Sequence, residues 1–140
     1  MKKFRCKVCG FVYNPAENND IAFEDLSPEW KCPVCGAPKE DFEEIHHMGE
    51  EQTGGEAQEK HVPVISEGEN GSTIVKVGTI EHPMLEEHHI VWVELREGNK
   101  SLKKLDLKPG NPPIATFKGI PYKPEYTAIE FCNLHGLWES

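Results

Sequence analysis

The sequence of 140 residues has no long hydrophobic run and few basic residues for its number of acidic ones. It has 15 lysines and arginines against 24 aspartates and glutamates, so its formal net charge is -9. Because phosphate binding requires a positive surface, nucleic acid is not expected as a partner. No apolar stretch follows Met1-Lys2-Lys3-Phe4 that could form a signal peptide or a membrane span, so we expect a cytoplasmic protein without a membrane partner.

The sequence also lacks any segment with a sustained helical period of apolar residues. Only 37% of its residues are hydrophobic, and it contains 11 prolines and 12 glycines. A small module of about 45 residues followed by one of about 80 would bury modest cores. Domains of this size commonly depend on a bound metal or on an oligomer partner, so we expect both metal ions and a homodimer.

The number of cysteines is odd, since the chain has five. In a reducing compartment cysteines are more often metal ligands than disulfide partners. Four of them lie in two matching motifs 22 residues apart, Cys6-Lys7-Val8-Cys9-Gly10 and Cys32-Pro33-Val34-Cys35-Gly36. Each motif places two thiolates on one tight loop, and the glycine after it accepts a positive φ. The two motifs predict a tetrahedral site of Cys6, Cys9, Cys32 and Cys35 that suits either zinc or iron.

Aromatic residues are frequent around these cysteines and are expected to shield the site and to form most of a very small core. They are Phe4, Phe11, Tyr13, Phe23, Trp30 and Phe42. Residues 4–13, 25–36 and 39–42 together resemble rubredoxin, although the interval between the two cysteine motifs is shorter than in a typical rubredoxin. The resemblance implies a one-iron centre that transfers single electrons. The alternative is a structural zinc ribbon, which would not absorb visible light.

Residues 46–58 are poor in apolar residues and contain three glycines and three acids, which predicts a flexible acidic linker. From residue 59 onward, short runs rich in β-branched residues alternate with turn residues. Strands are predicted at residues 72–77, 90–95, 114–117 and 126–131. Several strands with short turns in about 80 residues favour an immunoglobulin-like antiparallel β-sandwich. The predicted fold is therefore mostly β, with domains at residues 1–45 and 59–140.

A second set of candidate ligands lies in this domain and comprises four histidines and the fifth cysteine. Six positions of a strand would separate His82 from His88 by about 20 Å, and in a helix the two would point to different faces. Both can bind one ion only if the segment folds back as a loop, which Pro83 favours because proline cannot continue a sheet ladder. The full set is His61, His82, His88, Cys132 and His135.

Five ligands with a soft axial sulfur suit a square-pyramidal ion with a vacant sixth position, whereas structural zinc normally takes four. Spacing alone leaves open a simpler interpretation, in which scattered exposed histidines accompany one buried cysteine. Three segments nevertheless resemble the superoxide reductase family, also called desulfoferrodoxin or neelaredoxin. They are residues 59–65, residues 77–88, and the segment Phe131-Cys132-Asn133-Leu134-His135-Gly136-Leu137-Trp138.

The resemblance implies an iron with His61, His82, His88 and His135 around an equatorial plane and Cys132 on the axis. It selects His88 rather than His89, because the family's ligand occupies the first of these two positions. It also implies that Lys60 is catalytically important and that Glu59 can approach the open position. The first domain departs from the family pattern, since desulfoferrodoxins usually begin with a desulforedoxin-like module instead of a rubredoxin-like one.

The predicted function is superoxide reductase: superoxide, one electron and two protons give hydrogen peroxide. Electrons would come from an external donor, such as a rubredoxin or its reductase, through the four-cysteine iron, so two mononuclear iron ions are expected per chain. Backbone amides near Leu134 and His135 are predicted to donate hydrogen bonds to the Cys132 sulfur. Residues 100–123 hold six lysines and one acid, and we expect these lysines to surround the site and attract superoxide.

Three other functions are compatible with the same residues. A dismutase would use the ion alternately as reductant and oxidant and would evolve oxygen. An electron carrier or redox sensor would store an electron without reacting rapidly with superoxide. A zinc-stabilised binding module would be colourless.

Overall fold

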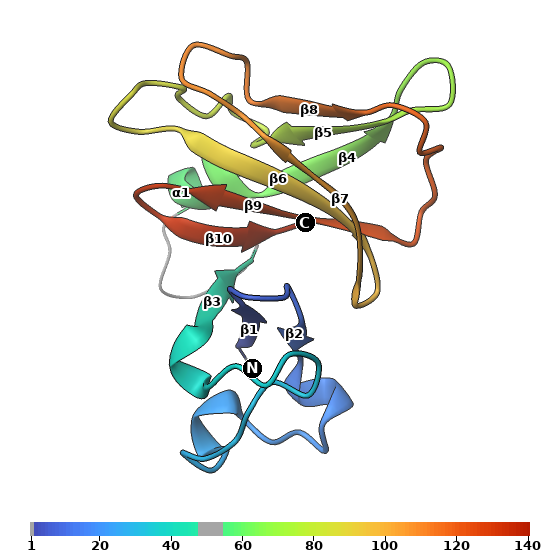
Figure 1. Ribbon diagram of the computed structural model, residues 1–140. Coiled ribbons are helices and arrows are strands. Elements are labelled where there is room, and N and C mark those ends of the chain that lie inside the picture. The colour runs from blue at the N-terminus through green and yellow to red at the C-terminus, as the bar shows by residue number, and fades with distance from the viewer. Residues whose placement is uncertain (1, 48–54) are drawn as a thin grey trace. The chain divides into compact units, whose positions relative to one another are not determined.

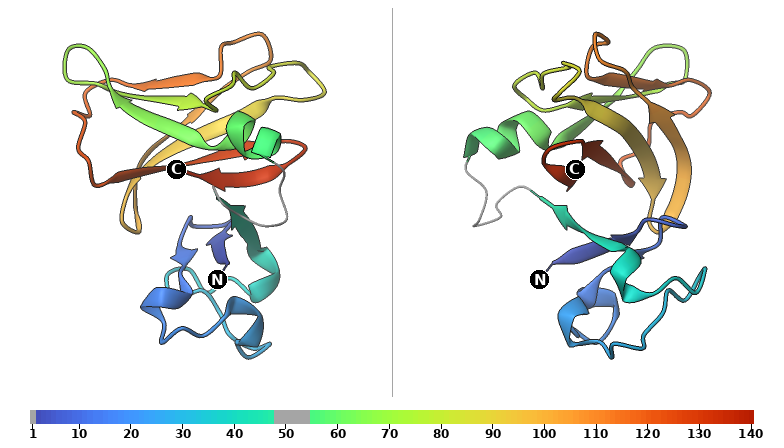
Figure 2. Two further views of the ribbon diagram at one scale, coloured as in Figure 1. Left: turned by 180° about the vertical axis from the view of Figure 1, so that it is seen from behind. Right: turned by 60° about the vertical axis from the view of Figure 1, so that its left-hand side comes forward.

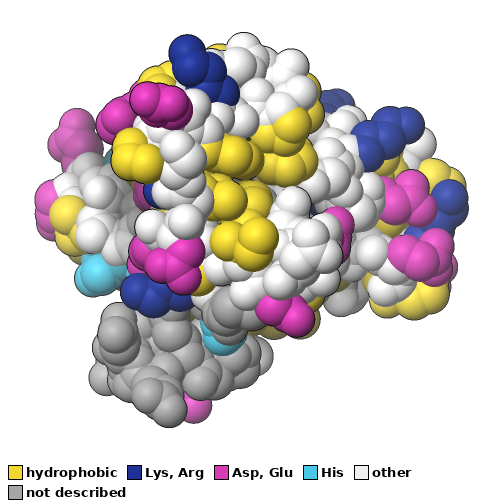
Figure 3. Space-filling model, turned by 90° about the horizontal axis from the view of Figure 1, so that it is seen from below, with side chains coloured by type: hydrophobic (Ala, Val, Ile, Leu, Met, Phe, Trp, Pro, Cys, Tyr) yellow, Lys and Arg dark blue, Asp and Glu magenta, His cyan; other side chains and the backbone are white. Residues whose placement is uncertain are grey.

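Figure 1 shows the computed structural model, which describes residues 2–47 and 55–140. The chain divides into two compact units, Met1–His46 and His47–Ser140. On the face shown in Figure 3, acidic side chains recur among the basic ones, in keeping with the negative net charge. None of the described helices has the length and apolar character needed to cross a membrane.

The first unit is built on a small antiparallel sheet with the strand order β2-β1-β3. In this sheet Phe4 pairs with Tyr13, and Cys6 pairs with Phe42. Three short 3-10 helices complete the unit. The elements are β1 (Lys3–Cys6), β2 (Val12–Tyr13), η1 (Pro15–Glu17), η2 (Phe23–Asp25), η3 (Lys39–Asp41) and β3 (Phe42–His46).

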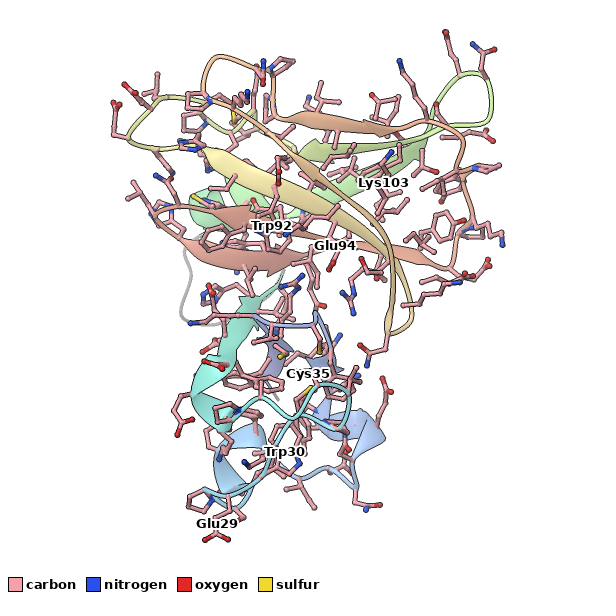
Figure 4. All side chains as sticks on the ribbon, viewed as in Figure 1. Glu29, Trp30, Cys35, Trp92, Glu94 and Lys103 are labelled. Atoms are coloured by element: carbon pink, nitrogen blue, oxygen red, sulfur yellow. The ribbon has the colours of Figure 1, made fainter. Side chains whose placement is uncertain are left out.

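Aromatic rings form the core of the first unit, as the sequence predicted. Phe4 stacks on Phe23 with ring centroids 4.2 Å apart, and Trp30 meets Phe42 edge-on at 5.3 Å. Tyr13 is buried, and its hydroxyl donates a hydrogen bond of 2.7 Å to the carbonyl of Ile21. The core therefore holds the loops between the strands as well as the strands themselves. Figure 4 labels Trp30 in this unit together with Cys35.

The second unit contains two antiparallel layers, visible in Figure 2. One layer has the strand order β10-β9-β6-β7, and the other has the order β4-β5-β8. The strands are β4 (Pro63–Glu67), β5 (Thr73–Val77), β6 (Ile90–Glu97), β7 (Lys100–Asp106), β8 (Ile114–Phe117), β9 (Tyr126–Cys132) and β10 (Gly136–Glu139). Fully buried Val75, Val77, Val93, Leu95 and Phe117 pack between the layers. This arrangement confirms the predicted immunoglobulin-like antiparallel β-sandwich.

The four strands predicted for the second unit are present, but three further strands of this unit, β4, β7 and β10, were not predicted. In β7, the register against β6 shifts between Leu95 and Arg96, so Leu102 and Leu105 do not show the alternation of a regular strand. β4 begins at Pro63, and β10 begins at Gly136, whose φ is +78°. Proline and glycine are usually found at the ends of strands, so the sequence pattern did not predict β4 or β10.

The predicted linker at residues 46–58 differs from the structure at both ends. His46 is the last residue of β3, and residues 55–58 belong to the helix α1 (Gly55–His61). Residues 48–54 of this prediction lie outside the described part of the chain. Alanine, glutamate, glutamine and lysine have high helix propensity, so the segment from 56 to 60 forms a helix despite its low apolar content.

The connections that carry the candidate ligands meet at one end of the sandwich. β5 ends there at Val77, β6 begins there at Ile90, and Ile90 pairs with Cys132 at the end of β9. In Figure 1 the β5–β6 loop, the β9–β10 turn and α1 lie on the same side of the second unit. The β4–β5 hairpin, the β6–β7 turn and the β8–β9 connection lie at the opposite end.

Candidate metal centres

Four cysteine sulfurs converge in the first unit, and all lie within 4.8 Å of one another. The Sγ atoms of Cys6 and Cys35 are 3.6 Å apart, as are those of Cys9 and Cys32. Four sulfurs about 2.3 Å from one ion in a tetrahedron would be separated by roughly 3.8 Å. The predicted cysteine set therefore has a spacing that fits a single tetrahedral metal ion.

The two cysteine loops have matching backbone geometry. The amide of Gly10 donates to the carbonyl of Cys6 at 3.0 Å, and the amide of Gly36 donates to that of Cys32 at 2.9 Å. The two glycines have φ values of +84° and +79°, as the motif predicted. Each loop thus holds its pair of sulfurs through the same closed turn.

One side of the four-cysteine cluster faces solvent. Cys6 and Cys32 are buried, whereas Cys9 and Cys35 are exposed, and the neighbouring Val8 and Val34 are 65% and 69% exposed. Desolvation raises the pKa of Cys9 to about 12, so a thiolate there needs the positive charge of a metal ion. The cluster therefore fits a metal ion with two ligands, Cys9 and Cys35, that are exposed to solvent.

The second cluster is assembled from four separate segments. His61 ends α1, His82 and His88 lie in the β5–β6 loop, Cys132 ends β9, and His135 lies in the β9–β10 turn. The β5–β6 loop folds back between residues 78 and 89 without forming a strand, as expected from Pro83. His82 Nδ1 donates to the Pro83 carbonyl at 2.7 Å, which leaves its Nε2 to face the cluster.

The four imidazoles stand at the corners of a near-square. Neighbouring ring centroids are separated by 4.6 Å for His61 and His82, 4.7 Å for His82 and His88, 5.0 Å for His88 and His135, and 4.8 Å for His135 and His61. The diagonal from His61 to His88 is longer, at 6.4 Å. This arrangement agrees with four equatorial ligands around one ion.

Cys132 lies on the axis of this square. Its Sγ is 3.5 Å from His82 Nε2 and 3.8 Å from His135 Nδ1, which belong to opposite corners. Burial raises the pKa of the Cys132 thiol, while hydrogen bonds from the backbone amides of Leu134 and His135 act to lower this pKa. These two amides confirm the predicted hydrogen bonds to the sulfur.

The ring nitrogens of the second cluster lie close together in an arrangement that suits binding to one cation. The Nε2 of His61 is 3.1 Å from His82 Nε2 and 3.1 Å from His135 Nδ1. The buried Nε2 of His88 has no hydrogen-bond partner among the described residues. Burial lowers the pKa of His82 to about 4, so this imidazole is neutral and can offer a lone pair. The ligand atoms of His61, His88, Cys132 and His135 all lie within 4.8 Å of one another. His82 joins this group through its Nε2, which is 3.1 Å from His61 Nε2 and 3.5 Å from Cys132 Sγ. The five residues fit an iron ion held by four imidazoles and one thiolate, and the four cysteines of the first unit fit another iron.

Trp138 was not predicted as a site residue, although it touches two of the candidate ligands. Its ring stacks on His61 at 4.9 Å with an interplanar angle of 18°, and its Nε1 donates to the His135 carbonyl at 3.1 Å. Trp138 is buried in β10, six positions after Cys132. Its position next to the ligand motif was visible in the sequence, but the stacking depends on the fold.

Glu130 is a second residue that the sequence did not single out. It is fully buried in β9, two positions before Cys132, and no described residue hydrogen-bonds to either carboxyl oxygen. Desolvation raises the pKa of Glu130 well above its usual range, because burial disfavours the charged carboxylate. No sequence signal distinguished it from the exposed glutamates.

Lys60 and Glu59 lie in the last turn of α1, just before the ligand His61. The pKa of His88 is lowered mainly by burial, then by the neighbouring His135, and then by the positive charge of Lys60. The Glu59 side chain is exposed, and Glu59 is not among the described residues whose ligand atoms converge. Lys60 is half-buried and directly precedes His61 in the chain, whereas Glu59 is exposed.

The turn at Gly78 holds this end of α1. Gly78 has a φ of +84°, and a Cβ at this position would lie 2.6 Å from the carbonyl oxygen of Lys60 and 2.8 Å from that of Glu59. The amide of Ile80 also donates to the Glu59 carbonyl at 3.1 Å. Glycine is required here because the turn packs directly against the backbone of the two predicted catalytic residues.

The expected ring of lysines around the site is not present. Lys100 follows the β6–β7 turn, and Lys118 and Lys123 follow β8, all at the end of the sandwich opposite the ligands. Figure 4 shows Lys103 away from the β5–β6 loop. Only Lys108 of this group lies in a loop that contacts the ligand end, through the bond from the Gly110 amide to the Met84 carbonyl. The lysines lie close together in the sequence but not in the fold, because successive strands run to opposite ends of the sandwich.

The remaining histidines lie outside both clusters. His46 Nδ1 is 3.7 Å from Glu44 in β3 of the first unit. His89 Nδ1 donates to the Leu85 carbonyl at 3.0 Å, so its ring turns away from the ligands. The choice of His88 over His89 agrees with the geometry.

Comparison with known proteins identifies both parts of the chain. The desulfoferrodoxin family matches residues 53–140, and the rubredoxin family matches residues 3–42. A desulfoferrodoxin of Syntrophotalea carbinolica is 37% identical over 142 residues, which cover all of this chain and 95% of that protein.

Two solved structures have a similar fold. A superoxide reductase from Treponema pallidum is 24% identical with a TM-score of 0.56, covering 100% of this chain and 98% of that one. A superoxide reductase (neelaredoxin) from Ignicoccus hospitalis is 31% identical with a TM-score of 0.53, covering 69% of this chain and 89% of that one. With its ligand cluster and its family match over residues 53–140, the chain belongs to the desulfoferrodoxin family.

Proposed function

We propose that the chain is a superoxide reductase, which converts superoxide, one electron and two protons into hydrogen peroxide without releasing oxygen. The observation that carries the proposal is the near-square of four imidazoles with the Cys132 sulfur on its axis. Five ligands leave one position of an octahedron for a small anion. The likeness to a neelaredoxin named as a superoxide reductase supports the proposal.

His61, His82, His88, Cys132 and His135 would hold the catalytic iron. When bound, this iron would supply the electron and the open position for superoxide. The Cys132 thiolate would donate electron density to the iron, and the amides of Leu134 and His135 would moderate this donation through their hydrogen bonds to the sulfur. The buried neutral imidazole of His82, fixed by its bond to the Pro83 carbonyl, would keep its place in the plane.

Lys60 would provide the positive charge that attracts the anion and would assist the protonation of the product, directly or through water. Its place in the last turn of α1, directly before His61, supports this role. We further propose that the Glu59 carboxylate would bind the iron once it is ferric and would leave when the site is reduced again.

The four-cysteine centre would relay electrons from an external donor, such as a rubredoxin or its reductase. Cys6, Cys9, Cys32 and Cys35 would hold the second iron. The exposure of Cys9 and Cys35 supports the relay, since electron transfer at the surface requires close approach of a partner. The rubredoxin match over residues 3–42 supports the same role.

Rapid mixing of the reduced protein with superoxide tests the proposal when peroxide and oxygen are measured together. A reductase forms one peroxide for each superoxide consumed and evolves no oxygen. Oxygen evolution would identify a dismutase instead. Oxidation of the reduced site at the same rate with and without superoxide would identify an electron carrier or sensor.

A further inference from the structure

Asn133 joins the two segments that carry the ligands of the second cluster. Its Oδ1 accepts a hydrogen bond of 2.9 Å from the backbone amide of His89, and its Nδ2 donates one of 3.1 Å to the carbonyl of Glu87. Its own backbone amide donates to the carbonyl of His89 at 3.2 Å. Three hydrogen bonds therefore connect the β9–β10 turn to the β5–β6 loop.

The segment that receives these bonds is itself a closed turn around His88. The amide of Leu85 donates to the His88 carbonyl at 2.9 Å, and the amide of His88 donates to the Leu85 carbonyl at 3.1 Å. The His89 ring closes the same turn, because its Nδ1 donates to the Leu85 carbonyl at 3.0 Å. A carbonyl can only accept, so this Nδ1 carries the proton.

His88 depends on this turn for its position. Its Nε2 is buried and has no hydrogen-bond partner among the described residues, so this atom is left to bind a metal ion. Its ring lies 4.7 Å from that of His82 and 5.0 Å from that of His135. The hydrogen bonds within residues 85–89 hold the backbone from which this imidazole extends to its corner of the square.

We propose that Asn133 and His89 form a clamp that positions His88 for metal binding, with neither residue acting as a ligand. Asn133 fixes the distance between the turn that bears Cys132 and His135 and the turn that bears His88. His89 keeps the second turn closed. The clamp rests on the metal centre of the proposed function, but it does not depend on the reaction that occurs there.

The clamp should affect metal binding more than folding. Asn133 is exposed, so water can satisfy the groups that lose a partner when its side chain is shortened, and the free energy of unfolding should change little. Residues that orient a metal ligand typically change metal affinity by about 10- to 100-fold when they are replaced. We expect a loss in this range for Asn133→Ala.

The experiment is a chelator competition with cobalt(II) on the full chain, with binding at the two centres followed separately by absorption. In Asn133→Ala, the dissociation constant of the histidine centre should rise about 10- to 100-fold. The four-cysteine centre of the same chain is the internal reference and should keep its affinity. Hydrogen exchange of the His89 amide in the metal-free protein should be faster in Asn133→Ala, because this amide loses its acceptor.

Further variants separate the parts of the clamp. Asn133→Asp keeps the oxygen that accepts from His89 but places a second oxygen against the Glu87 carbonyl, so its affinity should lie between wild type and Asn133→Ala. His89→Ala should weaken cobalt binding through the opened turn. Asn99→Ala is the matched control: Asn99 is exposed, and its Oδ1 accepts from the Arg96 guanidinium at 3.1 Å at the β6–β7 turn, at the end of the sandwich opposite the ligands, so its replacement should leave both affinities unchanged.

Equal cobalt affinity at the histidine centre in wild type and Asn133→Ala would overturn the clamp. An equal loss at both centres would also overturn it, because it would indicate general destabilisation. The outcome is separable from the proposed function: if the wild-type protein does not reduce superoxide but Asn133→Ala still loses affinity selectively, the function is wrong and the clamp stands.

Discussion

Single contacts from outside the ligand set fix the imidazoles of the second centre. Pro83 holds His82 through its carbonyl, and Trp138 stacks on His61 while donating to the carbonyl of His135. The contacts of Pro83 and of the Trp138 Nε1 are local in the sequence, whereas the stack of Trp138 on His61 joins residues that only the completed sandwich brings together. The resemblance to superoxide reductases implied both the identities of the five ligands and the arrangement of the four imidazoles around an equatorial plane.

Lys60 is predicted to control the rate with superoxide through its charge. Lys60→Ala should lower the second-order rate constant by about tenfold and weaken its dependence on ionic strength, because steering by a charge is screened by salt. Stopped-flow mixing at two salt concentrations measures both effects. Lys118→Ala is the control, since this lysine lies at the opposite end of the sandwich, and an equal loss there would contradict a local role for Lys60.

Tyr13 is predicted to make the first unit sensitive to alkaline pH. Desolvation raises the pKa of Tyr13, so the folded unit keeps a neutral phenol while the unfolded chain ionises near a pKa of about 10. The free energy of unfolding should therefore fall as the pH rises above about 10, until the raised pKa of the folded state is reached.

Denaturant unfolding of Tyr13→Phe at neutral and alkaline pH checks this sign. The variant should lose about 1 kcal/mol at neutral pH, because the bond to the Ile21 carbonyl is removed, and should show a smaller alkaline loss than wild type. Tyr122→Phe replaces an exposed tyrosine and should change neither quantity. Identical alkaline slopes in Tyr13→Phe and wild type would rule out this source of pH dependence.

At the scale of elements, the strands with alternating β-branched residues were predictable, and the irregular ones were not. Ile114–Phe117 was predicted with its observed bounds, whereas β7 was missed because its bulge breaks the alternation. α1 was missed because its stability does not come from an apolar stripe. The folded-back β5–β6 loop was predictable, because Pro83 excludes a continuous strand between two candidate ligands.

The turn at Gly78 is predicted to position the end of α1. Gly78→Ala should lower the free energy of unfolding by more than 1 kcal/mol and reduce the rate with superoxide, since the added Cβ meets the carbonyls of Lys60 and Glu59. Gly71→Ala is a matched control, because Gly71 has a φ of +71° with no atom within 4 Å of the added Cβ. Equal effects of both replacements on the rate with superoxide would show that the loss comes from the positive φ alone and not from contacts of the added Cβ with Lys60 and Glu59.

At the scale of the whole molecule, the two units carry different metal chemistries on one chain. The match to rubredoxin covers residues 3–42, and the desulfoferrodoxin match covers residues 53–140. The division into two domains was predictable from the change in cysteine, aromatic and β-branched content. The placement of the lysines was not, because it depends on the direction of each strand, and the homodimer stays a prediction.

The relay through the first unit predicts a selective defect in Cys9→Ser. Turnover with an external protein donor should fall at least tenfold, because one of the two exposed sulfurs of the four-cysteine centre is replaced. The reaction of a chemically reduced second centre with superoxide should be unchanged in the same variant. If donor-driven turnover also remained unchanged, electrons would reach the second centre by another route.

The central claim is that four histidines and Cys132 form the iron centre that reduces superoxide. Its most direct test compares wild type with Cys132→Ser by iron content, visible absorption and rapid mixing with superoxide. The account predicts two irons per wild-type chain, and it predicts that Cys132→Ser loses the sulfur-to-iron absorption of the second centre and most of the superoxide reaction, with the spectrum of the four-cysteine centre preserved. Survival of both that absorption and the rapid reaction in Cys132→Ser would contradict it.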